Sequence, residues 1–137
     1  MYGGVIIALD PWLFAVDQER RPLKTLEFAR SLVDVLEDKK AEDIVLLDVQ
    51  GISSFTDYFI IATGTSDRQL DALAEGLGEH MRKNLRQKSP RIQGKPAGGW
   101  ILVDCRDVIA HLFSPTQRER YKLEELWHEA KTVLRIQ

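Results

Sequence analysis

The sequence has a single cysteine, Cys105, and this scarcity excludes two ways of stabilising a small protein. One thiol cannot form a disulfide within the chain, nor can it supply the several thiolates of a structural zinc site. We therefore expect a protein of the reducing cytoplasm that depends on one hydrophobic core. A chain of 137 residues is long enough for such a core, since it can bury about two-thirds of the surface that its unfolded form exposes.

Long apolar runs and an excess of charge of one sign are also absent. No stretch approaches the roughly 20 apolar residues of a membrane-spanning helix, and no basic residue precedes the apolar segment Val5–Leu9, unlike in a signal peptide. Nineteen Lys and Arg residues against 21 Asp and Glu residues give a net charge of −2. Without an overall basic field, we expect no membrane partner and little or no direct nucleic-acid binding.

Regular structure is predicted to begin some way into the chain. Residues 1–23 show no sustained period, and we expect them to form a poorly ordered extension to a single domain, residues 24–137. From Thr25 onward, apolar residues recur at helical spacing with charged residues between them. This pattern predicts an amphipathic helix that ends near Lys40.

Apolar runs after this helix predict the strands. Two nearly continuous runs, Ile44–Val49 and Tyr58–Thr63, are typical of buried strands, and Arg91–Gln93 is a short candidate. Two further runs, Trp100–Asp104 and Val108–Phe113, flank a three-residue turn and therefore predict an antiparallel hairpin.

Two capping signals predict the remaining helices. Ser66 and Gln69 stand at the spacing of a capping box, in which each side chain satisfies a backbone N–H group at the helix start. Ser114 and Gln117 repeat this spacing, with Pro115 at the first helical position. The order is helix, two strands, helix, three strands, helix. This order predicts an α/β domain with a mixed five-stranded sheet flanked by helices.

The sequence patterns do not assemble a phosphate or metal site. The turn Gly64–Ser66 leads from a strand into a helix and could bind an anion, but its capping role is the better interpretation. A Walker phosphate loop is excluded because Pro96 follows Gly94-Lys95. Nucleotidyl transfer needs two carboxylates on one face of a strand, and the spacing of Asp104 and Asp107 does not provide this.

The histidines and the cysteine do not predict a reactive centre either. His80, His111 and His128 are scattered without the spacing of a metal site, so we interpret them as a helix-surface, a strand and a tail residue. Cys105 has no activating partner in a recognisable motif and is interpreted as a turn residue. We expect no catalytic residue, no metal and no cofactor.

Two groups of side chains suggest contacts with other molecules. The basic run Arg82–Lys88 indicates a solvated positive surface, with a contact to RNA phosphate as the alternative. Trp100, Asp104, Asp107 and the segment Tyr121–Trp127 together have the composition of a binding face, in which aromatic anchors accompany acids that select a basic partner. The alternative is that the end of this segment only covers the sheet.

Four ordered motifs carry a resemblance to a known family. They are LEFARSLVDVLEDKKAEDIVLLDV, TDYFIIATGTSDRQ, GGWILVDCRDVIAHLF and RERYKLEELW. On these motifs the chain resembles the Iojap family, also called ribosomal silencing factor RsfS, over Leu26–Trp127. The first twenty or so residues fall outside the resemblance.

The resemblance implies a fold similar to that of nucleotidyltransferases without their catalytic carboxylates. It also implies binding to the fourteenth protein of the large ribosomal subunit, which blocks joining of the two subunits and represses translation when nutrients are short. Family members can form homodimers. Carried over by position, the partner-binding residues would be Trp100, Leu102, Asp104, Asp107, Tyr121, Leu123, Glu124, Leu126 and Trp127. The rival hypothesis is an enzyme that acts on nucleotides through the turn at Gly64.

Overall fold

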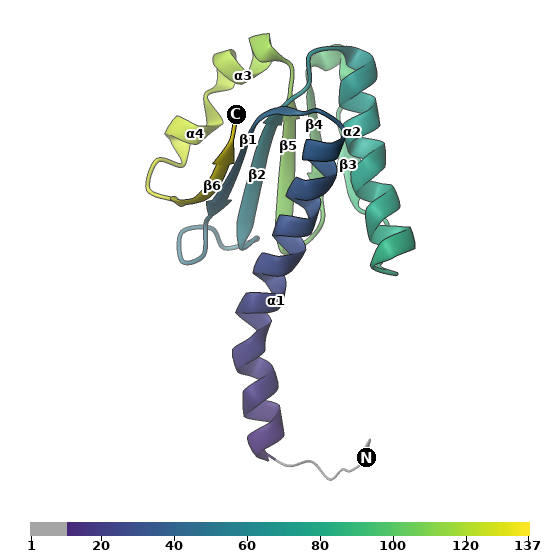
Figure 1. The fold of residues 1–137 in the computed structure, drawn as a ribbon. Coiled ribbons are helices and arrows are strands. Elements are labelled where there is room, and N and C mark those ends of the chain that lie inside the picture. The colour runs from purple at the N-terminus through teal and green to yellow at the C-terminus, as the bar shows by residue number, and fades with distance from the viewer. Residues whose placement is uncertain (1–10) are drawn as a thin grey trace.

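The domain is a mixed six-stranded sheet with helices on both faces (Figure 1). The computed structural model describes the backbone of residues 11–137 and the side chains from Lys24 onward. The sheet order is β3-β4-β5-β2-β1-β6. The strands are β1 (Glu42–Asp48), β2 (Tyr58–Thr63), β3 (Arg91–Gln93), β4 (Trp100–Asp104), β5 (Val108–Phe113) and β6 (Lys131–Ile136). The helices are α1 (Pro11–Asp38), α2 (Asp67–Glu79), the π-helical turn η1 (His80–Asn84), the 3-10 turn η2 (Pro96–Gly98), α3 (Pro115–Tyr121) and α4 (Leu123–Leu126).

The predicted strands are present within about two residues of their expected ends, whereas α1 begins at Pro11, well before the expected helix start at Thr25. The helix expected from Thr25 forms part of α1 and ends at Asp38. β2 and β5 run parallel, and β4 and β5 form the predicted antiparallel hairpin. The expected poorly ordered extension, residues 1–23, stays a prediction: its residues 11–23 belong to helix α1, and residues 1–10 lie outside the described part of the chain. Within the described part of the chain, no helix combines the length and apolarity needed to cross a bilayer.

The prediction of five strands was wrong, because the sheet has a sixth. β6 pairs antiparallel with β1, with Ile44 opposite Ile136, and it forms one edge of the sheet. Its side chains are exposed or only half-buried, so its sequence lacks the continuous apolar run that marks β1 and β2. The helix predicted after Ser114 is also interrupted, since Lys122 adopts a left-handed backbone with φ 45° and separates α3 from α4.

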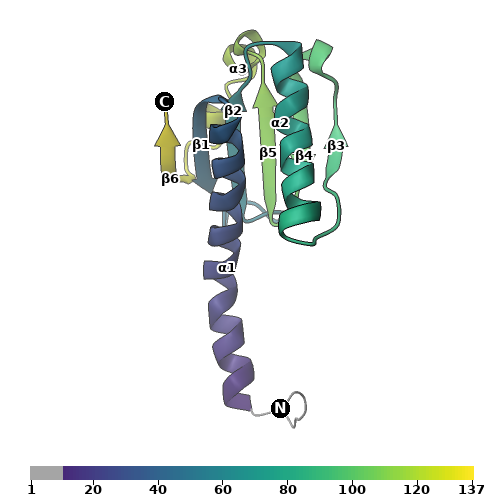
Figure 2. The same ribbon diagram turned by 45° about the vertical axis from the view of Figure 1, so that its right-hand side comes forward.

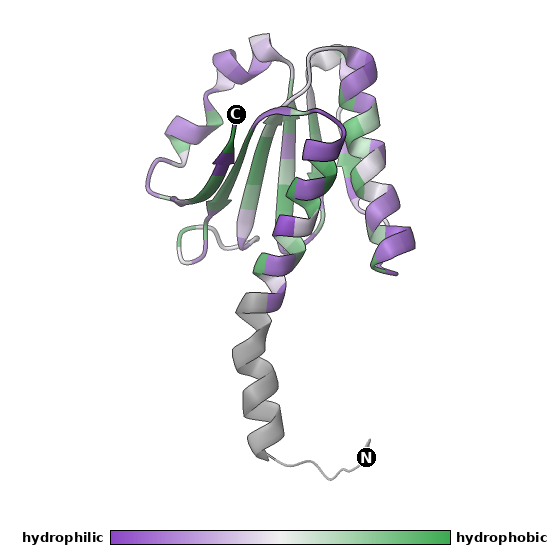
Figure 3. Cartoon of the chain, in the orientation of Figure 1, coloured by the Kyte–Doolittle hydropathy of each residue, from purple (hydrophilic) through white to green (hydrophobic). Residues whose placement is uncertain are grey.

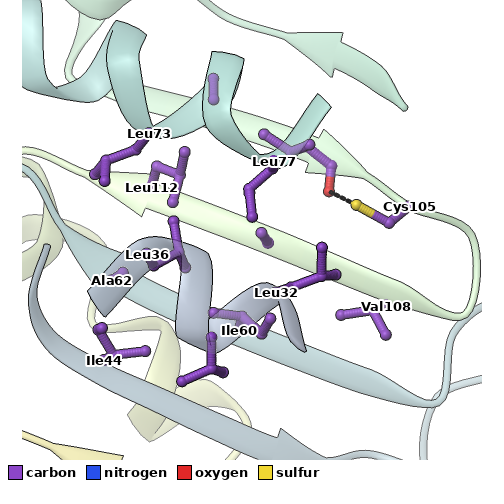
Figure 4. Close-up of a cluster of buried hydrophobic side chains, with 14 of the residues drawn as sticks. Leu32, Leu36, Ile44, Ile60, Ala62, Leu73, Leu77, Cys105, Val108 and Leu112 are labelled. Atoms are coloured by element: carbon purple, nitrogen blue, oxygen red, sulfur yellow. Dashed lines mark hydrogen bonds between the residues drawn. The ribbon is translucent and has the colours of Figure 1, made fainter. Parts of the chain in front are cut away.

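The helices α1 and α2 cover one face of the sheet and enclose the larger hydrophobic core. Figure 2 shows them side by side in front of the sheet, with α3 behind it. In Figure 4, Leu36 of α1 and Leu77 of α2 point toward the strands that carry Ile60 and Leu112. Figure 3 shows that the strands of the sheet consist mainly of hydrophobic residues, whereas α2 carries hydrophilic residues on its outer side, as expected of an amphipathic helix.

The opposite face of the sheet carries a second hydrophobic cluster that α3, α4 and the segment after them cover only in part. Its fully buried members include Ile61 and Phe113, and Leu123 of α4 packs into it. Trp100, Leu102 and Trp127 border this cluster and are only half-buried. This incompletely covered face contains most of the predicted binding residues.

Candidate interaction face

Strand β4 presents three of the predicted residues on one side of the sheet. Side chains alternate along a strand, so Trp100, Leu102 and Asp104 point away from α1 and α2, while Ile101 and Val103 enter the helix-covered core. All three outward residues are half-buried. The alternation of β4 therefore places an aromatic, an aliphatic and an acidic side chain in a row.

Trp100 is held in place by rings and by one hydrogen bond. Its ring centroid lies 4.6 Å from that of Tyr121 and 5.0 Å from that of Phe113. The indole Nε1 donates a hydrogen bond to Nδ1 of His111 at 3.3 Å. These contacts fix the indole before any partner is present.

Further rings continue from Trp100 across the sheet. The ring centroid of Phe59 lies 5.2 Å from that of His111 and 5.0 Å from that of Trp127, and both ring pairs meet edge to face. The ring centroid of Phe55 lies 6.3 Å from that of Phe59. We call this side of the sheet, from Phe55 to Trp100, the aromatic face. Sequence reasoning missed the contributions of Phe55, Phe59 and His111, although alternation along β2 and β5 was a usable signal for the last two.

Several apolar side chains of the aromatic face are open to solvent. Leu126 is 72% exposed, Phe55 64% and Tyr121 47%. Leu123, by contrast, is 9% exposed and belongs to the core beneath the face. Tyr121 contacts Trp100 and Phe55 contacts Phe59, and exposed apolar rings of this kind are typical of interaction surfaces. Leu123 therefore supports the face from below, and its contact with a partner stays a prediction.

Of the predicted acids, only Asp104 lies beside Trp100 and Leu102 on β4. Asp107 lies in the β4–β5 turn, at the opposite end of the hairpin from Trp100, where it contributes, after burial, to raising the pKa of Asp57. Glu124 forms an ion pair with Arg118 inside the molecule. Asp104 accepts the backbone N–H of Arg106. Asp104 thus shares a side of the sheet with Trp100 and Leu102, whereas Asp107 and Glu124 have other neighbours in the fold, and a role of these acids in binding stays a prediction.

Glu124 belongs to an ion-pair network that attaches α3 to the sheet. The side chain of Arg118 is 10% exposed, and its Nε and Nη2 donate to the two carboxylate oxygens of Glu124, each at 3.1 Å. Its Nη1 donates to the carbonyl oxygen of Asp43 and to Oγ1 of Thr63, at 2.6 and 2.8 Å. The carboxylate of Asp43 in turn accepts two hydrogen bonds from Arg135 of β6, each at 3.0 Å. This network connects α3, which carries Tyr121, to β1, β2 and β6.

His111 is neutral in the folded protein at pH 7. It is 6% exposed, and burial lowers its pKa from 6.5 to about 4. Because the indole of Trp100 can only donate, Nδ1 of His111 is the acceptor and Nε2 carries the proton. The protonated Nε2 is buried without a partner in the described part of the chain.

We expect this histidine to make stability fall with acid. Folding lowers the pKa of His111, so its contribution to stability is fully present above the unfolded pKa of 6.5. This contribution is lost as pH falls toward the folded pKa of about 4. From pH 7 to pH 4.5, His111 should lower the free energy of unfolding by roughly 2 kcal/mol. Urea titrations of wild-type protein and His111→Gln at both pH values measure this, since glutamine keeps an acceptor and does not titrate. An equal loss in both proteins would contradict the assignment.

Cys105 is not suited to nucleophilic chemistry. It lies in the hairpin turn, as predicted, but it is buried, and Figure 4 shows its thiol directed at the carbonyl oxygen of Val103, 3.8 Å away. Burial, and to a lesser degree Asp104, raises its pKa to about 12. At neutral pH it stays a thiol, and a thiol is a poor nucleophile.

The turn at Gly64 serves as a helix cap. Ser66 Oγ accepts the N–H of Gln69 at 3.0 Å, and Oε1 of Gln69 accepts the N–H of Thr65 at 2.7 Å. The N–H of Gly64 donates to Phe113. A Cβ atom at Gly64 would lie 2.8 Å from Leu70, so packing against α2 requires glycine here. Among the residues that the structure describes, no group of three His, Cys, Asp or Glu side chains could hold a metal ion.

Known proteins are similar to this chain in sequence and in fold. The profile of the family "Ribosomal silencing factor during starvation", RsfS, matches residues 22–137. Ribosomal silencing factor RsfS of Bacillus subtilis is 42% identical over 94 residues, which cover 69% of this chain and 79% of that protein. Mitochondrial assembly of ribosomal large subunit protein 1 of Mus musculus is 40% identical over 99 residues, covering 70% of this chain and 43% of that protein.

Solved structures agree with this relationship. A crystal structure of a protein from Chromobacterium violaceum superposes with a TM-score of 0.70 at 33% identity, covering 76% of this chain and 86% of that one. The profile match includes β6, the strand that the apolar pattern did not reveal. The chain shares sequence similarity with this family along nearly the whole domain, an α/β fold whose sheet has one aromatic face left partly open. The chain therefore belongs to the RsfS family of ribosomal silencing factors.

Proposed function

We propose that the protein binds the fourteenth protein of the large ribosomal subunit through the part of its aromatic face around Trp100 and thereby blocks joining of the two subunits. Family membership makes it a ribosome-associated factor that silences translation, a regulatory role and not an enzymatic one. The mouse relative is named for assembly of the large ribosomal subunit, which supports the choice of subunit.

The observation that carries this proposal is the ordered but uncovered aromatic surface around Trp100. Its indole is fixed by Tyr121, Phe113 and His111, while Tyr121 and Leu126 remain exposed. Aromatic residues that are already ordered and still accessible are typical anchors of interfaces, because little side-chain entropy is lost when a partner packs against them. Since the acids are dispersed, shape and apolar contact carry the proposed recognition more than charge does.

Sedimentation of ribosomal particles provides the test. Purified protein added to separated subunits should sediment with the large subunit and be absent from joined ribosomes. The extent of subunit joining, measured by light scattering, should decrease as the protein is added. Protein recovered at equal occupancy on joined ribosomes would contradict a steric block. Family members can form homodimers, and sedimentation of the free protein in the same buffer measures its oligomeric state.

We also propose that the fold is related to that of nucleotidyltransferases. We infer that the protein nevertheless does not bind or transfer nucleotides. The N–H groups of Gly64 and Thr65, the donors that a phosphate would need, are already used within the chain. Titration calorimetry with a nucleoside triphosphate and Mg²⁺ should show no binding. Magnesium-dependent binding would favour the enzymatic alternative.

A further inference from the structure

A basic hollow adjoins the end of the aromatic face that is distant from Trp100. It has a volume of about 520 Å³, and its aromatic and aliphatic lining comes from Phe55 and Ile109. Three cations, Lys88, Arg91 and Arg106, line it as well. We call this site, with these five residues, the basic hollow.

Tertiary structure brings the three cations together from separate segments. Lys88 follows η1, Arg91 begins β3, and Arg106 lies in the turn between β4 and β5. Within the described part of the chain, none of the three forms an ion pair. The carboxylate in the lining is Asp104, which accepts the backbone N–H of Arg106 at 2.8 Å. The lining therefore has a net positive charge although the whole chain has a net charge of −2.

The aromatic wall of the hollow distinguishes among anionic ligands. Phe55 is 64% exposed and lies in the loop between β1 and β2, so its ring is open to a second ring. Grooves that bind single-stranded nucleic acid combine cations for the phosphates with exposed aromatic rings on which bases stack. An acidic peptide would use the cations but would have no need of the ring.

We propose that the basic hollow binds a segment of single-stranded RNA, with a base stacked on Phe55 and phosphates held by Lys88, Arg91 and Arg106. The choice of RNA over DNA rests on the proposed function, because a ribosome presents RNA beside its proteins. The contact is separate from the one around Trp100. It gives the factor a second point of attachment, which raises affinity for a surface that offers both ligands.

Binding of a labelled 12-nucleotide single-stranded RNA to the full chain, followed by fluorescence anisotropy, tests the site. The double variant Arg91→Gln/Arg106→Gln should bind at least about 10-fold more weakly than wild type. A plot of log affinity against log salt concentration should become less steep, by about 0.7 in slope for each phosphate that is no longer neutralised. The control Arg68→Gln/Lys131→Gln removes the same charge from exposed positions outside the hollow and should bind like wild type. Equal affinity of the two double variants would overturn the proposal.

Variants of Phe55 test the stacking contact. Phe55→Leu keeps an apolar side chain without a ring and should weaken RNA binding several-fold, whereas Phe55→Tyr should bind like wild type. Equal affinity of both variants, or binding of a polyglutamate peptide as tight as that of RNA, would overturn the assignment to RNA.

A separate measurement distinguishes this site from the proposed protein interface. Trp100→Ala should weaken binding to the isolated fourteenth ribosomal protein and leave RNA binding unchanged, whereas the double variant of Arg91 and Arg106 should do the reverse. Loss of both activities in either variant would contradict two independent contacts. Far-UV circular dichroism confirms folding, which is expected because Arg91 and Arg106 are exposed.

Discussion

Replacing Trp100 with alanine is expected to weaken binding to the isolated fourteenth large-subunit protein by at least about 30-fold, which corresponds to about 2 kcal/mol. The ring is ordered between Tyr121 and Phe113, at centroid distances of 4.6 and 5.0 Å, so it offers a rigid contact surface. Truncation removes that surface and the support that the indole gives to Tyr121. Titration of the purified partner into both proteins measures the change.

Two matched variants show whether the loss is specific. Ile92→Ala removes an apolar side chain that is 50% exposed, opposite Val103 and hence on the helix-covered side of the sheet, and it should leave affinity unchanged. Trp100→Phe keeps a ring but removes the donor to His111, which separates ring packing from the hydrogen bond. If a folded Trp100→Ala protein bound as tightly as wild type, Trp100 would not belong to the interface.

Replacing Arg118 with alanine should lower the free energy of unfolding by roughly 2 to 4 kcal/mol. The guanidinium is 10% exposed and binds the carboxylate of Glu124 through two nitrogens, while its remaining donors reach Asp43 and Thr63. Its removal leaves these acceptors without their donor in a poorly solvated place. Urea unfolding followed by circular dichroism at pH 7 gives the difference.

The neighbouring arginine provides the control for this prediction. Arg120 lies on the same helix and is exposed, with its guanidinium 5.9 Å from the ring centroid of Tyr121, so Arg120→Ala should cost less than about 1 kcal/mol. Arg118→Lys keeps the charge but cannot reproduce the paired hydrogen bonds, and an intermediate loss is expected. If Arg118→Ala were as stable as Arg120→Ala, the network would not stabilise the attachment of α3.

The local elements of the fold were predictable because their signals are short-range. Ser66 and Ser114 cap α2 and α3 as expected, since a cap depends on residues only three positions apart. The strands β2 and β5 were evident because each is fully buried along its length. β6 was missed for the opposite reason: an edge strand with exposed side chains is stabilised by pairing with β1, a partner more than eighty positions earlier in the chain.

The candidate site was predicted in part for the same reason. The resemblance named Trp100, Leu102 and Asp104 together, and alternation along β4 places all three on one side of the sheet. The contact between Trp100 and Tyr121 joins two elements, and no spacing in the sequence reveals it. Glu124 could not be recognised as an internal partner, because nothing local indicates that Arg118 turns inward.

The sequence by itself determined most of the secondary structure and the family, because these follow from the order and polarity of neighbouring residues. Only the tertiary structure decided which groups share a surface. It set Trp100 against Tyr121 and His111, used Glu124 for internal pairing, and placed Arg91 and Arg106 beside Phe55. The physical reason is that burial and charge pairing depend on distances between segments, and strand pairing fixes those distances only when the chain has folded.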